Sequence, residues 1–229
     1  MSLKADLRKA HDEYLKADNP EASAIIDNFA FGEVLDEVDL PDRTRLLSNL
    51  AYLLGCQGID EFKLLLPVAL KNGVSPEEAR EVVYQAVDYL GLGRVLPFYQ
   101  AIKAADLPKG ATVGLAEEER LEAGEATQIR LFGPQMKNFA KKGTINKWLV
   151  KNCFGDYYTR TKLNDQDREM ITFCYLAAQG GVEPQLKSHA QANVRNGNDQ
   201  EFLRKIVLAN EPFIGYPRSL NALNIVNNL

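Results

Sequence analysis

Apolar residues recur along the chain at the three- and four-residue spacing of helices, and the strict alternation of a half-buried strand is absent. Residues 42–54 carry apolar side chains on nearly every face, as expected of a helix inside a core. Residues 3–17 carry a single apolar stripe, which is typical of a surface helix or an arm that docks on a partner. Helix signals cover both halves of the chain, so the pattern predicts an all-α fold.

Capping residues and glycines set the expected ends of these helices. Pro20 at a first helical position begins one helix, and Phe31-Gly32 is expected to end it, with Gly32 as a left-handed cap. The run Ser75-Pro76-Glu77-Glu78 is a strong start signal for another. The expected helices comprise residues 3–17, 20–29, 42–54, 61–71, 76–87, 95–105, 117–130, 136–139, 144–153, 165–178, 184–195, 200–210 and 219–227.

The second half of the chain repeats the first. Identical residues lie 123 positions apart in one stretch and 124 apart after a one-residue slip near Ile59. The matched pairs are Leu40/Leu163, Asp42/Asp165, Arg45/Arg168, Tyr52/Tyr175, Leu53/Leu176, Asn72/Asn196, Gly73/Gly197, Glu77/Glu201, Arg80/Arg204, Gly91/Gly215 and Arg94/Arg218. We therefore expect a tandem duplication, with units at residues 1–105 and 118–229 and a linker at 106–117.

The two copies differ at the positions that could carry acid/base chemistry. The second copy has Glu169 and His189, whereas the first has Leu46 and Leu65 at the corresponding positions. An imidazole titrates near neutral pH, and a neighbouring carboxylate can fix its tautomer and stabilise its charged form. His189 and Glu169 are therefore the candidate catalytic residues. The alternatives are a core or surface histidine and a solvated acid near a helix N-terminus.

Composition limits the classes of partner. A net charge of −4 and a pI near 5.4 give no general attraction to nucleic acid or anionic membranes. No apolar run approaches the roughly 20 residues that cross a bilayer, and the N-terminus lacks the apolar region of a secretory signal. Three cysteines without a CxxC pair suit free thiols in a cytoplasmic protein. His11 has no nearby Cys or His, so no metal cluster is expected.

An ordered series of short motifs resembles the carboxymuconolactone decarboxylase family, which includes the alkyl hydroperoxidase D-like proteins. The series is Phe-Gly, L-x-D-x-x-R-E, a Gly turn, Q-L-x-x-H, an Asn-Gly helix end and an aromatic-x-Gly-x-Pro elbow. The second copy carries all of it: Phe154-Gly155, Leu163, Asp165, Arg168, Glu169, Gly180-Gly181, Gln185-Leu186, His189, Asn196-Gly197, Phe213, Gly215 and Pro217. The first copy keeps the skeleton without the Glu or the His.

One departure from the family separates its two branches. The peroxidase branch has a CxxC whose second cysteine lies four residues before the histidine, but here these positions hold Val182 and Gln185. The first copy has Gly58 and Glu61 there. Peroxide reduction needs a thiolate and normally a resolving partner. The resemblance therefore implies the decarboxylase-like branch, with a His-centred site and a nearby Glu that act on a small acidic lactone or keto-acid without metal or organic cofactor.

The resemblance also implies assembly. Single-unit members of the family form rings, so a two-unit chain could build a ring or trimer with half as many subunits. The first copy would then wall the site and supply an interface. A non-catalytic assembly protein, with both units as scaffolds, is a rival reading.

Several further residues are candidates with open alternatives. A substrate with carboxylates needs cations, and Arg168 and Arg218 could bind it. Both arginines recur in the copy without the histidine, which favours a structural role such as capping carbonyls. Tyr216 could line the pocket or only pack.

The cysteines and the tryptophan leave a second reading open. Cys56 could be a lone redox thiol, which would make the chain a peroxiredoxin-type antioxidant, or an incidental buried cysteine. Cys174 and Trp148 are expected in the core.

Overall fold

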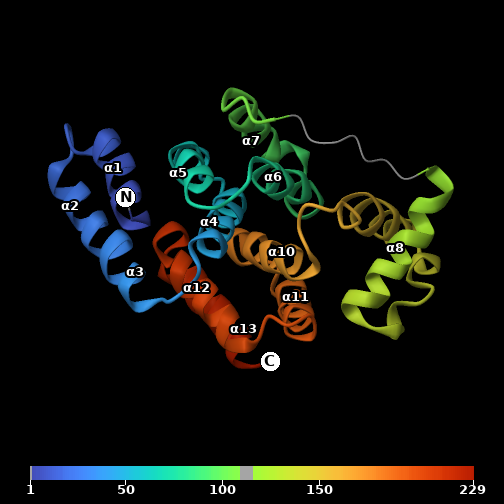
Figure 1. The fold of residues 1–229 in the computed structure, drawn as a ribbon. Coiled ribbons are helices and arrows are strands. Elements are labelled where there is room, and N and C mark those ends of the chain that lie inside the picture. Colours follow the sequence, from blue (N-terminus) through green and yellow to red (C-terminus); the bar gives the residue numbers. More distant parts are fainter. Residues whose placement is uncertain (1, 109–115) are drawn as a thin grey trace.

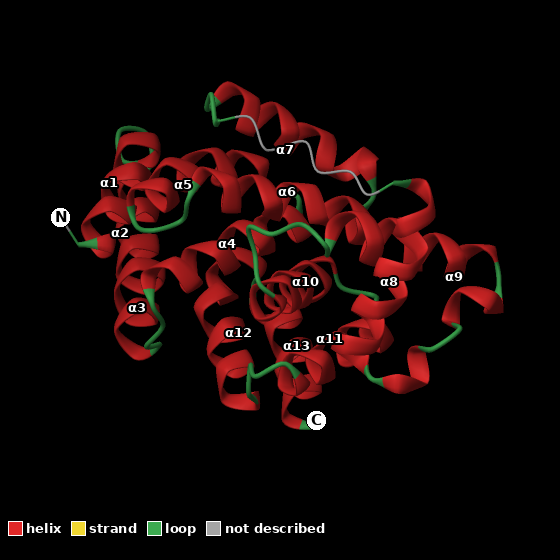
Figure 2. Ribbon diagram, turned by 45° about the vertical axis from the view of Figure 1, so that its right-hand side comes forward, coloured by secondary structure: helices red, strands yellow, loops and turns green. Residues whose placement is uncertain are grey.

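The fold is all-helical, as predicted. The computed structural model describes residues 2–108 and 116–229, and Figure 2 shows helices joined by loops, with no strand in the described part of the chain. The first unit contains α1 (Leu3–Leu15), α2 (Pro20–Asn28), the π-helical turn η1 (Phe29–Glu33), α3 (Val34–Glu37), α4 (Asp42–Cys56), α5 (Ile59–Lys71), α6 (Pro76–Leu90) and α7 (Leu92–Ala104).

The second unit repeats this order. It contains α8 (Glu117–Phe132), the short 3-10 turns η2 (Pro134–Met136) and η3 (Phe139–Lys142), α9 (Thr144–Trp148), the π-helical η4 (Leu149–Tyr157), α10 (Asp165–Gln179), α11 (Glu183–Arg195), α12 (Gln200–Ile214) and α13 (Tyr216–Asn227). Helices α10–α13 correspond to α4–α7. The predicted linker falls largely on residues 109–115, which lie outside the described residues, so its bounds stay a prediction.

The strongest start signals act as expected. The Ser75 hydroxyl accepts from the Glu78 amide at 3.2 Å, and the Glu78 carboxylate accepts from the Ser75 amide at 2.7 Å, which forms a capping box at the start of α6. Pro20 occupies the first position of α2. At Ser75 the capping side chains satisfy N–H groups that the helix itself leaves free, and at Pro20 the proline lacks such an N–H. Local sequence alone therefore sets the start of both helices.

The prediction for Gly32 was wrong. Gly32 is not a left-handed cap: it lies inside η1, which continues directly into α3. A Cβ at Gly32 would lie 3.2 Å from the Asp27 carbonyl oxygen, and one at Gly155 would lie 2.5 Å from the Arg120 carbonyl oxygen. Gly155 therefore serves the close approach of α8, whereas Gly32 lies against the preceding turn of its own helical segment, and neither glycine ends a helix.

Helices α4 and α10 form the centre of the molecule and pack against each other (Figure 1). Their crossing is close because Gly55 of α4 faces α10: a Cβ at Gly55 would lie 2.6 Å from the Ala178 Cβ and 2.7 Å from the Tyr175 carbonyl oxygen. Both helices are buried along nearly their whole length. One continuous core therefore contains apolar side chains of both units.

Each unit also packs its third long helix on the other unit's central helix. α12 lies on α4, and α6 lies on α10. Buried polar bonds fix these contacts: Asn49 donates to Asn210 at 2.7 Å, and the Tyr175 hydroxyl donates to the Val82 carbonyl at 2.6 Å. The two units are thus interlocked. Helices α1–α3 and helix α8 lie at opposite ends of the molecule (Figure 1).

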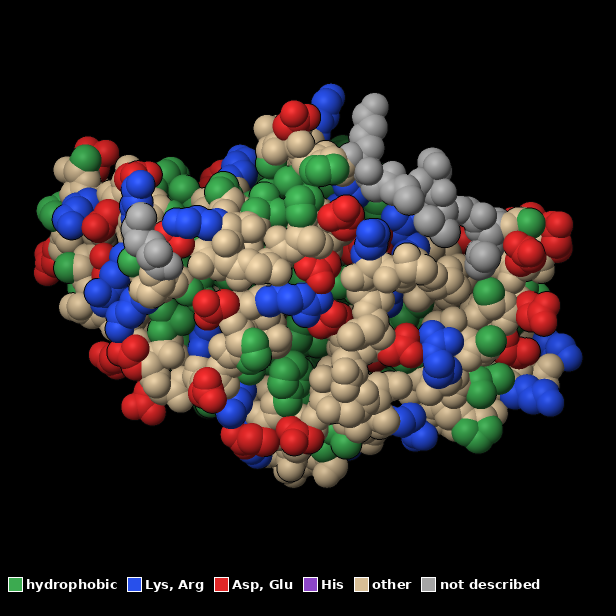
Figure 3. All heavy atoms as spheres, viewed as in Figure 1, with side chains coloured by type: hydrophobic (Ala, Val, Ile, Leu, Met, Phe, Trp, Pro, Cys, Tyr) green, Lys and Arg blue, Asp and Glu red, His purple; other side chains and the backbone are tan. Residues whose placement is uncertain are grey.

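α1 is the surface helix of the two alternatives given for residues 3–17: it packs on α5 with Leu3, Leu7 and His11 buried, whereas Lys9 and Glu13 are exposed. Trp148 differs from expectation: it was expected in the core but is 62% exposed on α9. Helical spacing alone did not show which face of this short helix meets the core. In Figure 3 the drawn face shows charged, apolar and neutral polar side chains intermixed.

The crossing at Gly55 gives a direct test. Gly55→Ala should lower the free energy of unfolding by about 2 kcal/mol, because the added methyl overlaps Ala178 and the Tyr175 backbone. Gly93→Ala is the matched control: Gly93 lies in α7 with nothing within 4 Å of its Cβ position, so the change should be neutral or slightly stabilising. Chemical denaturation measures both. Equal stabilities of the two variants would contradict the close crossing.

Asp88, near the C-terminal end of α6, is a carboxylate between the units whose burial lowers the stability of the fold at neutral pH. Asn152 donates to Asp88 Oδ1 at 2.9 Å, but Oδ2 is buried and has no partner among the described residues. Burial raises the pKa of Asp88 to about 7, and the Asp156 carboxylate contributes. Because the folded pKa lies above the unfolded value, the folded state binds the proton more tightly, and stability is lost as pH rises from about 4 to about 7.

Asp88→Asn should remove this loss. The amide can still accept from Asn152, so the variant should gain about 2 kcal/mol over the wild type at pH 8, allowing for partial exposure, and little at pH 4. Urea denaturation at the two pH values measures the difference. A gain that is the same at both pH values would show that burial of the charge is not the cause.

Candidate functional site

His189 and Glu169 come from adjacent helices of the second unit. Asn164 caps α10 by accepting from the Asp167 amide at 2.8 Å, and Glu169 follows in the next turn. Gly180 and Gly181, with φ of 67° and 72°, reverse the chain between α10 and α11, which is what glycine permits. α11 then packs back on α10 and carries His189 on its inner face.

The two side chains form a direct pair. His189 Nδ1 lies 2.8 Å from Glu169 Oε2, Glu169 is fully buried, and His189 is 8% exposed. A carboxylate only accepts, so Nδ1 carries the hydrogen and Nε2 is left for proton exchange. No hydrogen-bond partner of Nε2 occurs among the described residues. The pair that the sequence predicted is therefore brought together in a geometry suited to general acid/base chemistry.

The second carboxylate oxygen is unpaired. Glu169 Oε1 is buried without a partner in the described part of the chain. Asn193 is fully buried and donates to the main-chain carbonyls of both Glu169 and His189 at 2.8 Å each. It joins the two helices at the level of the pair, so the spacing of imidazole and carboxylate is fixed by backbone as well as side-chain contacts.

Two aromatic rings hold the imidazole between them. Phe132 of α8 and Tyr89 of α6 meet it edge to face, with centroid distances of 5.3 and 5.4 Å. Tyr89 belongs to the first unit, so the site is completed across the duplication. The sequence pointed to neither ring, although Tyr89 and Phe213 lie 124 positions apart as the aromatic residues of the two elbows.

A chain of hydroxyls lies behind Tyr89. The Tyr89 and Tyr158 hydroxyls are 2.8 Å apart, and Tyr158 is 2.7 Å from Thr172 Oγ1, which accepts from Gln85 Nε2 at 2.8 Å. Burial raises the pKa of both tyrosines well above the usual value, so both phenols stay neutral. This chain orients Tyr89 against the imidazole.

Arg168 is used within the fold. It is 1% exposed, and it donates to Glu81 at 3.2 Å, to Gln85 at 2.7 Å and to the Arg160 carbonyl at 2.7 Å. Arg45, its counterpart, likewise donates to a carbonyl, that of Val38. These contacts favour the structural role for Arg168 over substrate binding, the two alternatives that the sequence left open.

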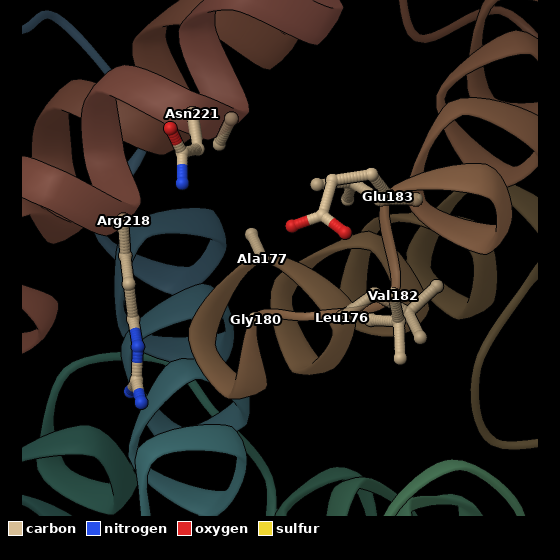
Figure 4. Close-up of a pocket in the computed structure, with 9 residues that line it drawn as sticks. Leu176, Ala177, Gly180, Val182, Glu183, Arg218 and Asn221 are labelled. Atoms are coloured by element: carbon tan, nitrogen blue, oxygen red, sulfur yellow. The ribbon is translucent and has the colours of Figure 1, made fainter.

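Arg218 and Tyr216 begin α13, beside other hollows. Arg218 donates to the Ala178 carbonyl at 2.5 Å and borders a hollow of about 10 Å³. Figure 4 shows its side chain running past Gly180, with Glu183 across the hollow. Tyr216 is 64% exposed and lines a larger cavity near Cys56. The hydrogen bonds and hollows of these two residues do not involve His189 or Glu169.

Cys56 is a half-buried thiol. Its Sγ lies 3.7 Å from the Leu53 carbonyl oxygen, and burial raises its pKa, so the nucleophilic thiolate is disfavoured. Cys153 and Cys174 are buried, the latter in the core as expected. No group of three or more His, Cys, Asp or Glu side chains that could hold a metal ion occurs within residues 2–108 and 116–229. None of the helices described there is both long and apolar enough to cross a bilayer.

Two proteins with known sequences or structures resemble this chain. The chain is 35% identical over 80 residues to 4-carboxymuconolactone decarboxylase of Acinetobacter baylyi, a match that covers 35% of this chain and 60% of the length of that relative. A putative gamma-carboxymuconolactone decarboxylase subunit of Burkholderia xenovorans has the same fold, with a TM-score of 0.59 at 21% identity over 96% of this chain and 93% of that one.

The family match covers both halves. The model of the carboxymuconolactone decarboxylase family matches residues 20–106 and again residues 144–228. Two matches in one chain agree with the internal repeat and with the paired helices α4–α7 and α10–α13. The chain therefore belongs to the carboxymuconolactone decarboxylase family, as a tandem member with two family units.

Proposed function

We propose that the protein is a cofactor-independent carboxy-lyase that decarboxylates a small unsaturated lactone acid or keto-acid. The observation that carries the proposal is the buried His189–Glu169 pair, whose Nδ1 is engaged and whose Nε2 has no partner among the described residues. The named decarboxylase relative supports the reaction class. The substrate class comes from that relative and is part of the proposal.

The chemistry needs one proton donor. Loss of carbon dioxide breaks a C–C bond, and its electron pair passes into the conjugated carbonyl system as a dienolate. The imidazolium Nε2–H then protonates carbon, and the neutral imidazole regains its proton from water. Glu169 stabilises the imidazolium form between these steps. The edge-to-face contacts with Phe132 and Tyr89 restrict the orientation of the imidazole ring.

Arg218 is the better candidate for a second substrate carboxylate. Arg168 is buried and already paired with Glu81. Arg218 is exposed, and its one hydrogen bond within the described part of the chain goes to the Ala178 carbonyl. We propose that Arg218 attracts acidic substrates. Arg168, which pairs with Glu81, and Tyr216, which lines the cavity near Cys56, are not assigned to that substrate. Assembly of this chain into a homo-oligomeric ring, which would place further residues near the site, stays a prediction.

The thiol alternative has less support. Cys56 lacks a resolving partner, because the other two cysteines are buried, and its raised pKa keeps it protonated. A thiol peroxidase would need an accessible resolving thiol and a thiol pKa that is lowered rather than raised. The non-catalytic assembly alternative would be favoured by a His189 whose two ring nitrogens are both satisfied by backbone, whereas here Nδ1 pairs with Glu169 and Nε2 has no partner among the described residues.

Removal of the pair tests the proposal. His189→Leu, Glu169→Leu and the double variant should each lower decarboxylation of 4-carboxymuconolactone, measured as carbon dioxide release, with His189→Leu losing about 10²–10⁴-fold. The double variant copies the leucines of the first unit, Leu46 and Leu65, which pack there fully buried. Undiminished turnover in folded His189→Leu protein would refute the assignment.

The same variants give a stability cycle. His189→Leu alone leaves the buried Glu169 carboxyl without a partner, so it should lower the free energy of unfolding by about 2–4 kcal/mol. Adding Glu169→Leu should restore at least half of that loss. Denaturant titrations of the four proteins measure the coupling. If the two single effects simply add, the side chains do not interact in the folded protein.

A further inference from the structure

A large cavity lies in the first unit, at the end of the molecule away from α8. It has a volume of about 540 Å³, within the range of small-molecule sites. Its lining residues come from α1, α2 and η1, from α4 and α5, and from the C-terminal end of α12 and the start of α13. The cavity is thus completed across the duplication, as the His189 site is. The His189–Glu169 pair takes no part in its lining.

Most of the lining is apolar. The apolar side chains that face the cavity come from α1, α2, η1, α4 and α12. They are Leu15, Ile25, Ile26, Phe29, Phe31, Leu53, Pro212 and Phe213. Such a lining suits the hydrocarbon or aromatic body of a small molecule.

A second imidazole–carboxylate pair lies in this lining. His11 Nε2 is 2.6 Å from Glu61 Oε1, and His11 Nδ1 donates to the Leu7 carbonyl at 2.8 Å. His11 is 3% exposed. Burial opposes its protonation, but Glu61 outweighs burial and raises the pKa of His11, so the imidazolium neutralises Glu61.

The pair is built from different helices than its counterpart. His11 comes from α1 and Glu61 from α5, whereas His189 comes from α11 and Glu169 from α10. Glu61 stands where the second unit has Gln185, one helical turn before Leu65, which replaces the histidine. The first unit therefore has an imidazole–carboxylate pair of its own, in the lining of a cavity of about 540 Å³.

Glu211 is the unpaired group of this lining. It is 8% exposed, its Oε2 is buried, and no hydrogen-bond partner for that atom occurs among the described residues. It lies in the last turn of α12, where the helix dipole disfavours negative charge. Burial raises its pKa. A buried polar group without a partner costs roughly 1–3 kcal/mol, and a ligand that donates a hydrogen bond removes that cost.

We propose that this cavity is a second ligand site, which takes a small molecule with an aromatic or branched apolar body and a hydroxyl or ammonium group that donates to Glu211. The His11 imidazolium neutralises Glu61, so Glu211 is the carboxyl in the lining that has no partner among the described residues, and it repels the carboxylate of an acidic ligand. The ligand therefore differs in charge from the acids proposed for the His189 site.

Three molecules of one shape test the proposal on the full chain. Calorimetric titration with 2-phenylethanol, 2-phenylethylamine and 3-phenylpropanoate should show binding of the alcohol, the amine or both, and at least tenfold weaker binding of the acid. Stronger binding of the alcohol assigns a neutral donor, and stronger binding of the amine assigns a cation. No binding of either donor, or equal binding of the acid, would overturn the proposal.

Variants locate the binding. Glu211→Leu should weaken the preferred donor at least tenfold and should not unfold the protein, because it removes an unpaired buried carboxyl. Glu201→Gln, on the exposed first turn of the same helix, is the matched control and should change nothing. The His189→Leu/Glu169→Leu double variant should bind as the wild type does, which separates this site from the proposed decarboxylase site. Unchanged binding in Glu211→Leu would place the ligand elsewhere.

Discussion

The close crossing of α4 and α10 is the contact on which the rest of the structure depends. Gly55 lets the two central helices approach until the Ala178 methyl and the Tyr175 carbonyl fill the space of a side chain. At that separation α6 reaches α10 and α12 reaches α4, so each unit covers the other's central helix. The polar bonds between Asn49 and Asn210 and between Tyr175 and Val82 then fix the alignment of the interlocked units.

This interlocking places the end of an exchanged helix at each candidate site. Tyr89, at the end of α6, packs on His189 of the second unit. Phe213 and Glu211, at the end of α12, line the cavity of the first unit. Neither unit alone contains a complete site. Duplication within one chain therefore allows the two sites to differ, because the sequence of each unit can change independently.

The sites have diverged in their buried charges. Leucines fill the first unit at the positions of Glu169 and His189, and they pack fully buried. A buried carboxyl group without its partner lowers stability, so loss of the histidine there favours loss of the glutamate as well. The first unit places its own imidazole on α1 instead, against Glu61 on α5. That change leaves the second unit with the arrangement suited to protonation at carbon, and the first with a mostly apolar cavity that contains the His11–Glu61 pair and Glu211.

The sequence was sufficient for the features that local pattern or repetition determines. The capping box at Ser75 and the periodic apolar positions of α4 and α10 predicted the helices, and the mismatch of the two copies predicted the His189–Glu169 pair. Gly32 was misjudged because a glycine that serves close packing and one that ends a helix look alike in sequence. The His11–Glu61 pair was missed because 50 residues separate its members and no spacing rule joins them. Trp148 was misplaced because a five-residue helix has too few positions to show its buried face.

The central claim is that Glu169 holds the His189 imidazole with its hydrogen on Nδ1 and leaves Nε2 for proton transfer. Nitrogen-15 NMR of histidine-labelled protein tests it directly, because the chain has only two histidines and one His11 variant assigns both. The account predicts a protected Nδ1–H proton of His189, shifted far downfield by the carboxylate and absent in Glu169→Leu. A neutral His189 with its hydrogen on Nε2, or an Nδ1–H signal that survives loss of Glu169, would contradict it.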